Sequence, residues 1–74
     1  MNQLTTLRVI YGCTERESVL AVTLARGCSL AEAAATLGIS IHTARTHLKR
    51  VFRKTGTSRQ TELLRLLLLP PGQR

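Results

Sequence analysis

Two copies of one short pattern constrain this chain most, because each marks the start of a helix. In Thr14-Glu15-Arg16-Glu17, and again in Ser29-Leu30-Ala31-Glu32, a hydroxyl residue stands three positions before a glutamate. This pattern is a capping box, in which the two side chains satisfy backbone N–H groups at the helix start. Gly27 and Gly38 follow the two helices and can take the left-handed conformation that ends a helix. The chain is therefore expected to fold as short helices joined by tight turns.

Two further helices are expected from similar signals. Ser40 is placed to cap a helix over residues 41–55, which Gly56 ends. Ser58 is placed to cap a last helix, which ends at Pro70-Pro71 because proline interrupts helical hydrogen bonding. The second helix is short, and a glycine turn separates it from the longer third helix. This order is that of a helix-turn-helix, whose second helix enters the major groove of DNA.

We expect these four helices to form a single all-α domain over residues 13–70, with the third as the recognition helix. Residues 1–12 fit a short helical face as well as a strand, and we interpret them as a linker or an appended element. Residues 71–74 are expected to be a frayed tail. The linker-like start favours a fragment of a larger protein over a stand-alone domain.

The chain is strongly basic, with 11 Lys and Arg residues against four Asp and Glu residues and a net charge of +7. Such a balance attracts polyanions, nucleic acid first and acidic membrane surfaces second. No acidic residue lies between Glu32 and Glu62, and the basic residues of that stretch are Arg45, Lys49, Arg50, Arg53, Lys54 and Arg59. Only Tyr11 and Phe52 are aromatic, which disfavours binding of RNA or single strands by base stacking.

The third helix has an apolar face and a basic face when its residues are placed about 100° apart. The inner face holds Ala44, Leu48, Val51 and Thr55, with Phe52 at its edge. The opposite face holds His42, Arg45, Thr46, Lys49 and Arg53, and the flank between them holds Thr43, His47, Arg50 and Lys54. Arginine and lysine can donate to guanine in the major groove, and flanking cations can hold the phosphate backbone. The alternative is a solvated basic face on a helical bundle.

Four segments match motifs of one known protein family. Residues 14–20 (TERESVL) are similar to a TxRExEV opening, and residues 25–34 (ARGCSLAEAA) to an AxGxSxKEIA segment. Residues 37–47 (LGISIHTARTH) resemble LxISxxTVKxH, and residues 54–57 (KTGT) resemble KLGV. On these motifs the chain resembles the output domain of LuxR/FixJ/GerE-type transcription regulators, over residues 13–69 and with every spacing kept. It implies a domain that binds double-stranded DNA in a sequence-specific manner.

The resemblance also implies roles for single residues. Thr43 and His47 would contact backbone phosphates or brace the helix. Arg45 would lie at the groove, and Lys49 would contact a base or a phosphate one turn later. Together with the basic face, this gives the candidate DNA-binding residues Ser40, His42, Thr43, Arg45, Thr46, His47, Lys49, Arg50 and Arg53.

The chain departs from the family pattern at a few positions that concern packing. Cys13 stands where an apolar residue is usual, and Val19 replaces the second glutamate of the opening motif. Thr55 and Thr57 replace the leucine and valine of KLGV, so we expect a more polar junction between the third and fourth helices. The family's arginine in the fourth helix falls on Gln60, and we carry its role over to no residue.

The last helix holds more leucine than a single core contact requires. In the resembled family this helix mediates homodimerisation, which would place two recognition helices on successive major grooves. The candidate dimerisation residues are Leu63, Leu64, Leu67 and Leu68. The alternatives are that all the leucines pack in the domain's own core, or that they contact an upstream sensor domain.

Enzymatic and metal chemistry do not assemble from these residues. Cys13 and Cys28 are far from zinc-finger spacing, and His42 and His47 project from different sides of a helix. No phosphate-binding glycine loop, catalytic triad or carboxylate pair is found, so we expect no enzyme, no metal and no cofactor. With no secretory signal, and no apolar run long enough to span a membrane, a reducing cytoplasm is the expected location.

Three other functions compete with that of a regulator's DNA-binding domain. A promoter-reading helix-turn-helix of a sigma factor has a similar layout and would bind RNA polymerase. A protein-interaction module would use the leucine-rich helix over residues 58–69. RNA binding is disfavoured by the missing aromatics.

Overall fold

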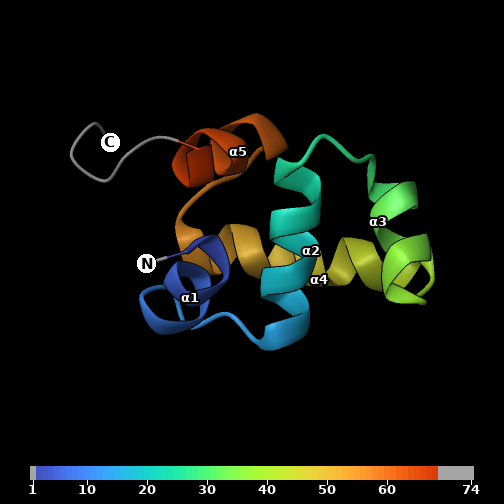
Figure 1. Cartoon of the computed structure of the whole chain (residues 1–74), viewed down its shortest axis with the longest axis horizontal. Helices are drawn as coiled ribbons and strands as arrows, with labels where there is room; N and C mark the ends of the chain where they lie inside the picture. Colours follow the sequence, from blue (N-terminus) through green and yellow to red (C-terminus); the bar gives the residue numbers. More distant parts are fainter. Residues whose placement is uncertain (1, 69–74) are drawn as a thin grey trace.

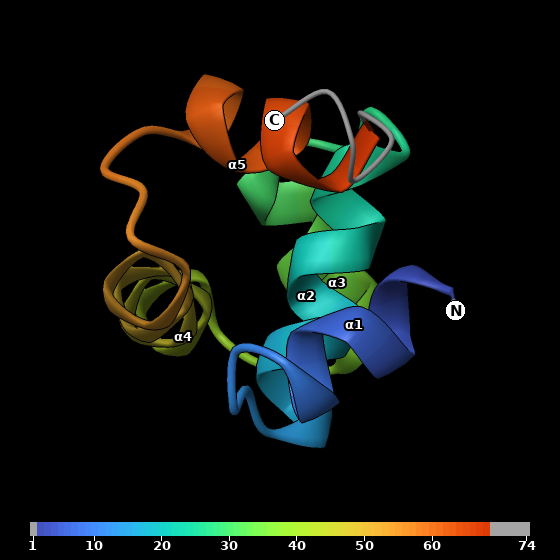
Figure 2. The same ribbon diagram turned by 90° about the vertical axis from the view of Figure 1, so that its left-hand side faces the viewer.

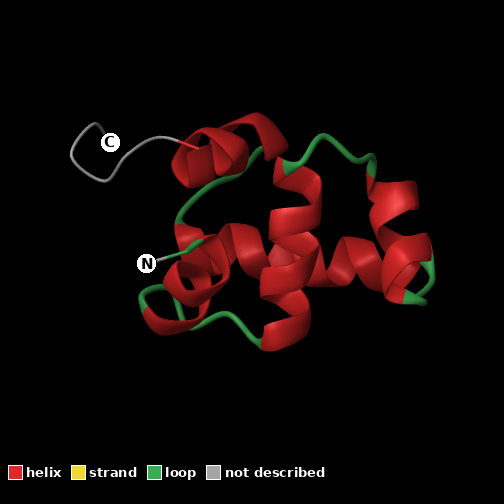
Figure 3. Ribbon diagram, viewed as in Figure 1, coloured by secondary structure: helices red, strands yellow, loops and turns green. Residues whose placement is uncertain are grey.

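The structure, a computed structural model, describes residues 2–68. This part of the chain forms five helices and no strand (Figures 1 and 3). In chain order they are α1 (Gln3–Val9), α2 (Glu15–Ala25), α3 (Leu30–Leu37), α4 (Ile41–Thr55) and α5 (Gln60–Leu68). The expected all-α fold is confirmed, and the four expected helices are α2 to α5. The helix end at Pro70-Pro71 and the frayed tail lie outside the described residues.

Both capping boxes form as the sequence predicts. The Thr14 hydroxyl accepts the Glu17 N–H at 3.1 Å, and the Glu17 carboxylate accepts the Thr14 N–H at 2.9 Å. The corresponding distances between Ser29 and Glu32 are 3.1 and 2.8 Å. At the end of α3, Gly38 has φ 69° and ψ 31°, a left-handed conformation that glycine adopts without steric cost. The helix starts and this tight turn therefore follow from local chemistry.

The start of α5 differs from the expectation that Ser58 caps the helix directly. Both the N–H and the hydroxyl of Ser58 donate to Glu62 Oε1, at 3.0 and 2.8 Å. The helix begins later, at Gln60, and the carbonyl of Arg59 accepts the first intrahelical bond, from the Leu63 N–H, at 3.1 Å. Because its hydroxyl is used as a donor, Ser58 supports the helix through the Glu62 side chain.

The sequence left the conformation of residues 1–12 open, and within this stretch Gln3–Val9 form the helix α1. The Asn2 side chain caps α1 by accepting the Thr5 N–H at 2.8 Å. Leu7 is fully buried, and its carbonyl accepts the Cys13 N–H at 3.0 Å. Gln3 Nε2 donates to the Leu67 carbonyl at 3.0 Å, which joins α1 to α5. This N-terminal helix is therefore packed into the core of the domain.

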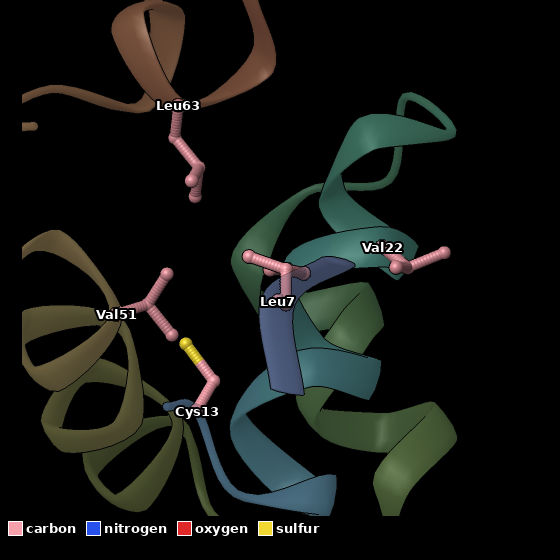
Figure 4. Packing of buried hydrophobic residues seen from close by; sticks show 6 residues of the cluster. Leu7, Cys13, Val22, Val51 and Leu63 are labelled. Atoms are coloured by element: carbon pink, nitrogen blue, oxygen red, sulfur yellow. The ribbon is translucent and has the colours of Figure 1, made fainter. Parts of the chain in front are cut away.

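The core surrounds α2, which crosses in front of α4 in Figure 1 and passes behind α1 in Figure 2. One cluster contains Leu7, Cys13, Ala21, Val22, Val51 and Leu63 (Figure 4). The other contains Leu20, Leu24, Ala33, Ala34 and Ala44. The small alanines of the second cluster allow α3 and α4 to approach α2 closely. As a result α4 is fixed along one side, and Figure 2 shows it at the edge of the molecule.

Candidate nucleic-acid interface

The inner face of α4 is the one predicted from the helical pattern. Ala44 and Val51 are fully buried, one in each core cluster. Leu48 is half-buried and packs against both clusters, and Phe52 is half-buried against the first. With this side held by the core, the opposite side of α4 faces solvent.

Most of the candidate DNA-binding residues lie together on that exposed side. Those that are exposed are Ser40, His42, Arg45, Thr46, Lys49, Arg50 and Arg53. Thr43 and His47 are half-buried, in line with a flanking position. The Ser40 hydroxyl caps α4 by accepting the Thr43 N–H at 3.1 Å, and it donates to the Thr43 hydroxyl at 3.0 Å. Ser40 and Thr43 thus fix the start of the helix as well as bordering its exposed face.

His47 is the one candidate whose ring is partly turned into the protein. Its Nδ1 atom is buried and has no hydrogen-bond partner within the part of the chain that the structure describes. A contact with DNA would therefore have to involve the exposed part of the ring. The bracing role that the family resemblance implies for this histidine is compatible with this position.

The charges of α4 are not equivalent. Within residues 2–68 there is one ion pair, in which Lys54 Nζ lies 2.7 Å from Glu17 Oε1. Arg45, Lys49, Arg50 and Arg53 therefore have no acidic partner in the described chain. The sequence grouped Lys54 with the flank of α4, and no local pattern indicated that it contacts α2.

The partner of Lys54 is an unusual glutamate, because Glu17 is only 1% exposed. Burial alone would raise the pKa of Glu17. Hydrogen bonds from Lys54 and from the Thr14 N–H, with the positive charge of Lys54, outweigh burial and hold this pKa below its ordinary value. Glu17 is therefore an ionised, buried carboxylate at neutral pH, and it joins α2 to the last turn of α4.

The leucines of α5 are mostly engaged within the domain. Leu63 is fully buried in the first cluster, and Leu67 packs against the same cluster. Leu64 packs against the second cluster. Of the four candidate dimerisation residues, Leu68 alone is exposed, at 61%.

The cysteines are free thiols, and no metal cluster is formed in the described residues. Cys13 is buried and Cys28 half-buried. Burial, followed by the charge of Glu17, raises the pKa of Cys13, so its thiol is poorly suited to act as a nucleophile. No group of three or more His, Cys, Asp or Glu side chains within residues 2–68 is arranged to hold a metal ion. None of the described helices is long and apolar enough to cross a membrane.

The short α3, the turn at Gly38 and the longer basic α4 form a helix-turn-helix, which defines a class of DNA-binding domain. The profile of the GerE family, described as bacterial regulatory proteins of the luxR family, matches residues 13–67. The chain belongs to this family, and it contains the DNA-binding domain of a transcription regulator. No curated protein and no solved structure matches the chain. Residues 1–12, with α1, lie outside the matched region.

Proposed function

We propose that this domain binds double-stranded DNA in a sequence-specific manner by placing α4 in the major groove. The observation that carries the proposal is the contrast between the two sides of α4. One side is fixed in the core, and the other presents Arg45, Lys49, Arg50 and Arg53 with no acidic partner in the described chain. An α-helix about 10–12 Å across fits a major groove about 12 Å wide.

The positions of the side chains along α4 favour base contacts for some residues and phosphate contacts for others. Arg45, Thr46 and Lys49 lie near the middle of the exposed side, where they would reach base edges, and the two basic residues would donate to guanine. Arg50 and Arg53 lie further along α4 and would neutralise phosphates. Ser40, His42, Thr43 and His47 would contact the backbone or hold the start of the helix.

The test first uses the domain to select its preferred duplex from a random-sequence pool of duplex DNA. Binding to that selected duplex is then titrated by fluorescence anisotropy at several salt concentrations. We expect affinity to fall steeply with salt, because each neutralised phosphate adds about 0.9 to the slope of log K against log salt. Arg45→Ala/Lys49→Ala should weaken binding to the selected duplex by about a hundredfold or more, since each base contact contributes discrimination.

Arg8→Ala/Arg65→Ala is the matched control, because it removes the same charge from exposed residues of α1 and α5. It should leave sequence preference intact. If both double variants lose affinity equally, the proposal that α4 reads the groove is wrong. The basic face would then contribute only non-specific attraction to the phosphate backbone.

We further propose that the domain acts as a homodimer on DNA, as the family resemblance implies, with contact at the end of α5. Leu68 is the exposed member of the candidate set and would be central to that contact, with the half-buried Leu64 and Leu67 contributing from the same helix. Sedimentation on a duplex with two half-sites should show two chains bound for the wild type and one for Leu68→Glu. Equal stoichiometry would exclude this surface. The structure offers no observation that favours a sigma-factor role or an interaction module.

A further inference from the structure

One basic residue of α4, Lys54, is in an ion pair within residues 2–68. The side chain of Lys54 is 32% exposed and that of Glu17 is 2% exposed, with 2.7 Å between Nζ and Oε1. Glu17 lies in the first turn of α2 and Lys54 in the last turn of α4. The pair therefore connects the start of one helix to the end of another.

We propose that Glu17 and Lys54 are positioning residues for DNA binding: their ion pair sets the orientation of α4 on α2, and Lys54 itself makes no phosphate contact. The inference rests on the proposed placement of α4 in the major groove. It separates the cations of α4 into those that bind DNA and one that orients the helix.

Lys54 is expected to keep this partner when DNA is bound. Glu17 Oε1 also accepts the Thr14 N–H at 2.9 Å, so the carboxylate is fixed by its own capping box and cannot follow the lysine outward. Moving Lys54 to a phosphate would leave a buried, unpaired carboxylate, which is strongly unfavourable. Arg53, the preceding residue, is exposed and has no acidic partner in the described chain, so it can reach a phosphate without such a cost.

The ion pair is a directional contact between α2 and α4, whose other contacts are mainly apolar. Ala44, Leu48 and Val51 hold α4 against the core through apolar contacts, and hydrophobic burial by itself is non-directional. A charge-assisted hydrogen bond has a preferred geometry and allows less rotation. The pair therefore selects the rotation that aims Arg45 and Lys49 outward together.

The decisive variant is Glu17→Gln. Glutamine can complete a capping box, so the start of α2 is retained while the charge of the pair is lost. Removing a negative charge from a DNA-binding domain should by itself tighten binding. The positioning role predicts the opposite, a loss of about tenfold, comparable to one mismatched base pair. The matched control is Glu15→Gln, which makes the same charge change at an exposed site in the same turn and should not weaken binding.

A second comparison tests whether Lys54 contacts a phosphate. Lys54→Gln should weaken binding about as much as Glu17→Gln without changing the slope of log K against log salt. Lys54→Arg keeps the positive charge and should retain wild-type affinity. Arg53→Gln should lower the slope by about 0.9, the value for one lost phosphate contact. The double variant Glu17→Gln/Lys54→Gln should bind no worse than either single variant, because both remove one interaction.

All affinities are measured on the duplex that the wild type selects from the random pool, well below the thermal midpoint of each variant. Tighter binding by Glu17→Gln, equal to that of Glu15→Gln, would overturn the positioning role. A slope lowered by about 0.9 in Lys54→Gln would overturn the assignment of Lys54. Salt-independent binding by the wild type would instead refute the proposed function itself, so the two failures are distinguishable.

Discussion

The two capping boxes of this domain have the same chemistry in different surroundings. In each, the hydroxyl accepts the glutamate N–H at 3.1 Å. The glutamate carboxylate accepts the N–H of the hydroxyl residue, at 2.9 Å in the α2 box and 2.8 Å in the α3 box. Glu17, at the start of α2, is 1% exposed and bound to Lys54. Glu32, at the start of α3, is exposed and has no cationic partner within residues 2–68.

The difference is that the glutamate of the α2 box also makes a tertiary contact. At α3 the motif only starts a helix, and water can reach the same groups. At α2 the same glutamate also accepts a hydrogen bond from Lys54 in the last turn of α4, 37 residues further along the chain. A local motif thus becomes part of the tertiary structure once its acid is buried beside a cation.

The strongest test of this comparison removes each hydroxyl in turn. Thr14→Ala should cost about 2 kcal/mol of unfolding free energy, at the upper end for a helix cap, because the Glu17 N–H is shielded from water. Ser29→Ala should cost about 1 kcal/mol, because solvent can replace the lost bond at an exposed site. Urea-induced unfolding, followed by circular dichroism, measures both.

Thr14→Ser and Ser29→Thr are the matched controls, since each keeps a capping hydroxyl. Both should remain close to the wild type in stability. Equal losses for the two alanine variants would mean that burial of Glu17 adds nothing to its cap.

The helix starts could be predicted because capping is local. A hydroxyl and a glutamate three residues apart contain the information for α2 and α3, and Ser40 does so for α4. The exposed face of α4 followed for the same reason, since helical periodicity fixes which side chains lie together. These features need no knowledge of the rest of the molecule.

Features that depend on how helices cross could not be predicted in this way. The helical pattern placed Lys54 on a flank, but its contact with Glu17 depends on the packing of α2 against α4. The leucines of α5 were too many for a single contact, yet α5 packs against both clusters, so Leu63, Leu64 and Leu67 all find partners within the domain. In α1, the burial of Leu7 depends on the tertiary fold, which a short stretch of sequence does not contain.

The smallest expected effect appears in acid. The pKa of Glu17 in the folded chain is held below its ordinary value of 4.5, because the bonds from Lys54 and Thr14 outweigh the effect of burial. A carboxyl whose folded pKa is lowered adds stability that is present above the unfolded pKa and is lost as pH falls through the folded pKa. The unfolding free energy of the wild type should therefore begin to fall near pH 4.5 and continue to fall below it.

Glutamine variants show which of the two capping boxes causes the loss of stability in acid. Bonds from the N–H and the hydroxyl of Ser29 also lower the pKa of Glu32, but its full exposure weakens their effect on stability. Urea unfolding between about pH 7 and pH 3 should give a clearly flatter pH profile for Glu17→Gln and a nearly wild-type profile for Glu32→Gln. If Glu32→Gln flattened the profile as much, the acid sensitivity would belong to capping in general, and the bond between Glu17 and Lys54 would have no special part in it.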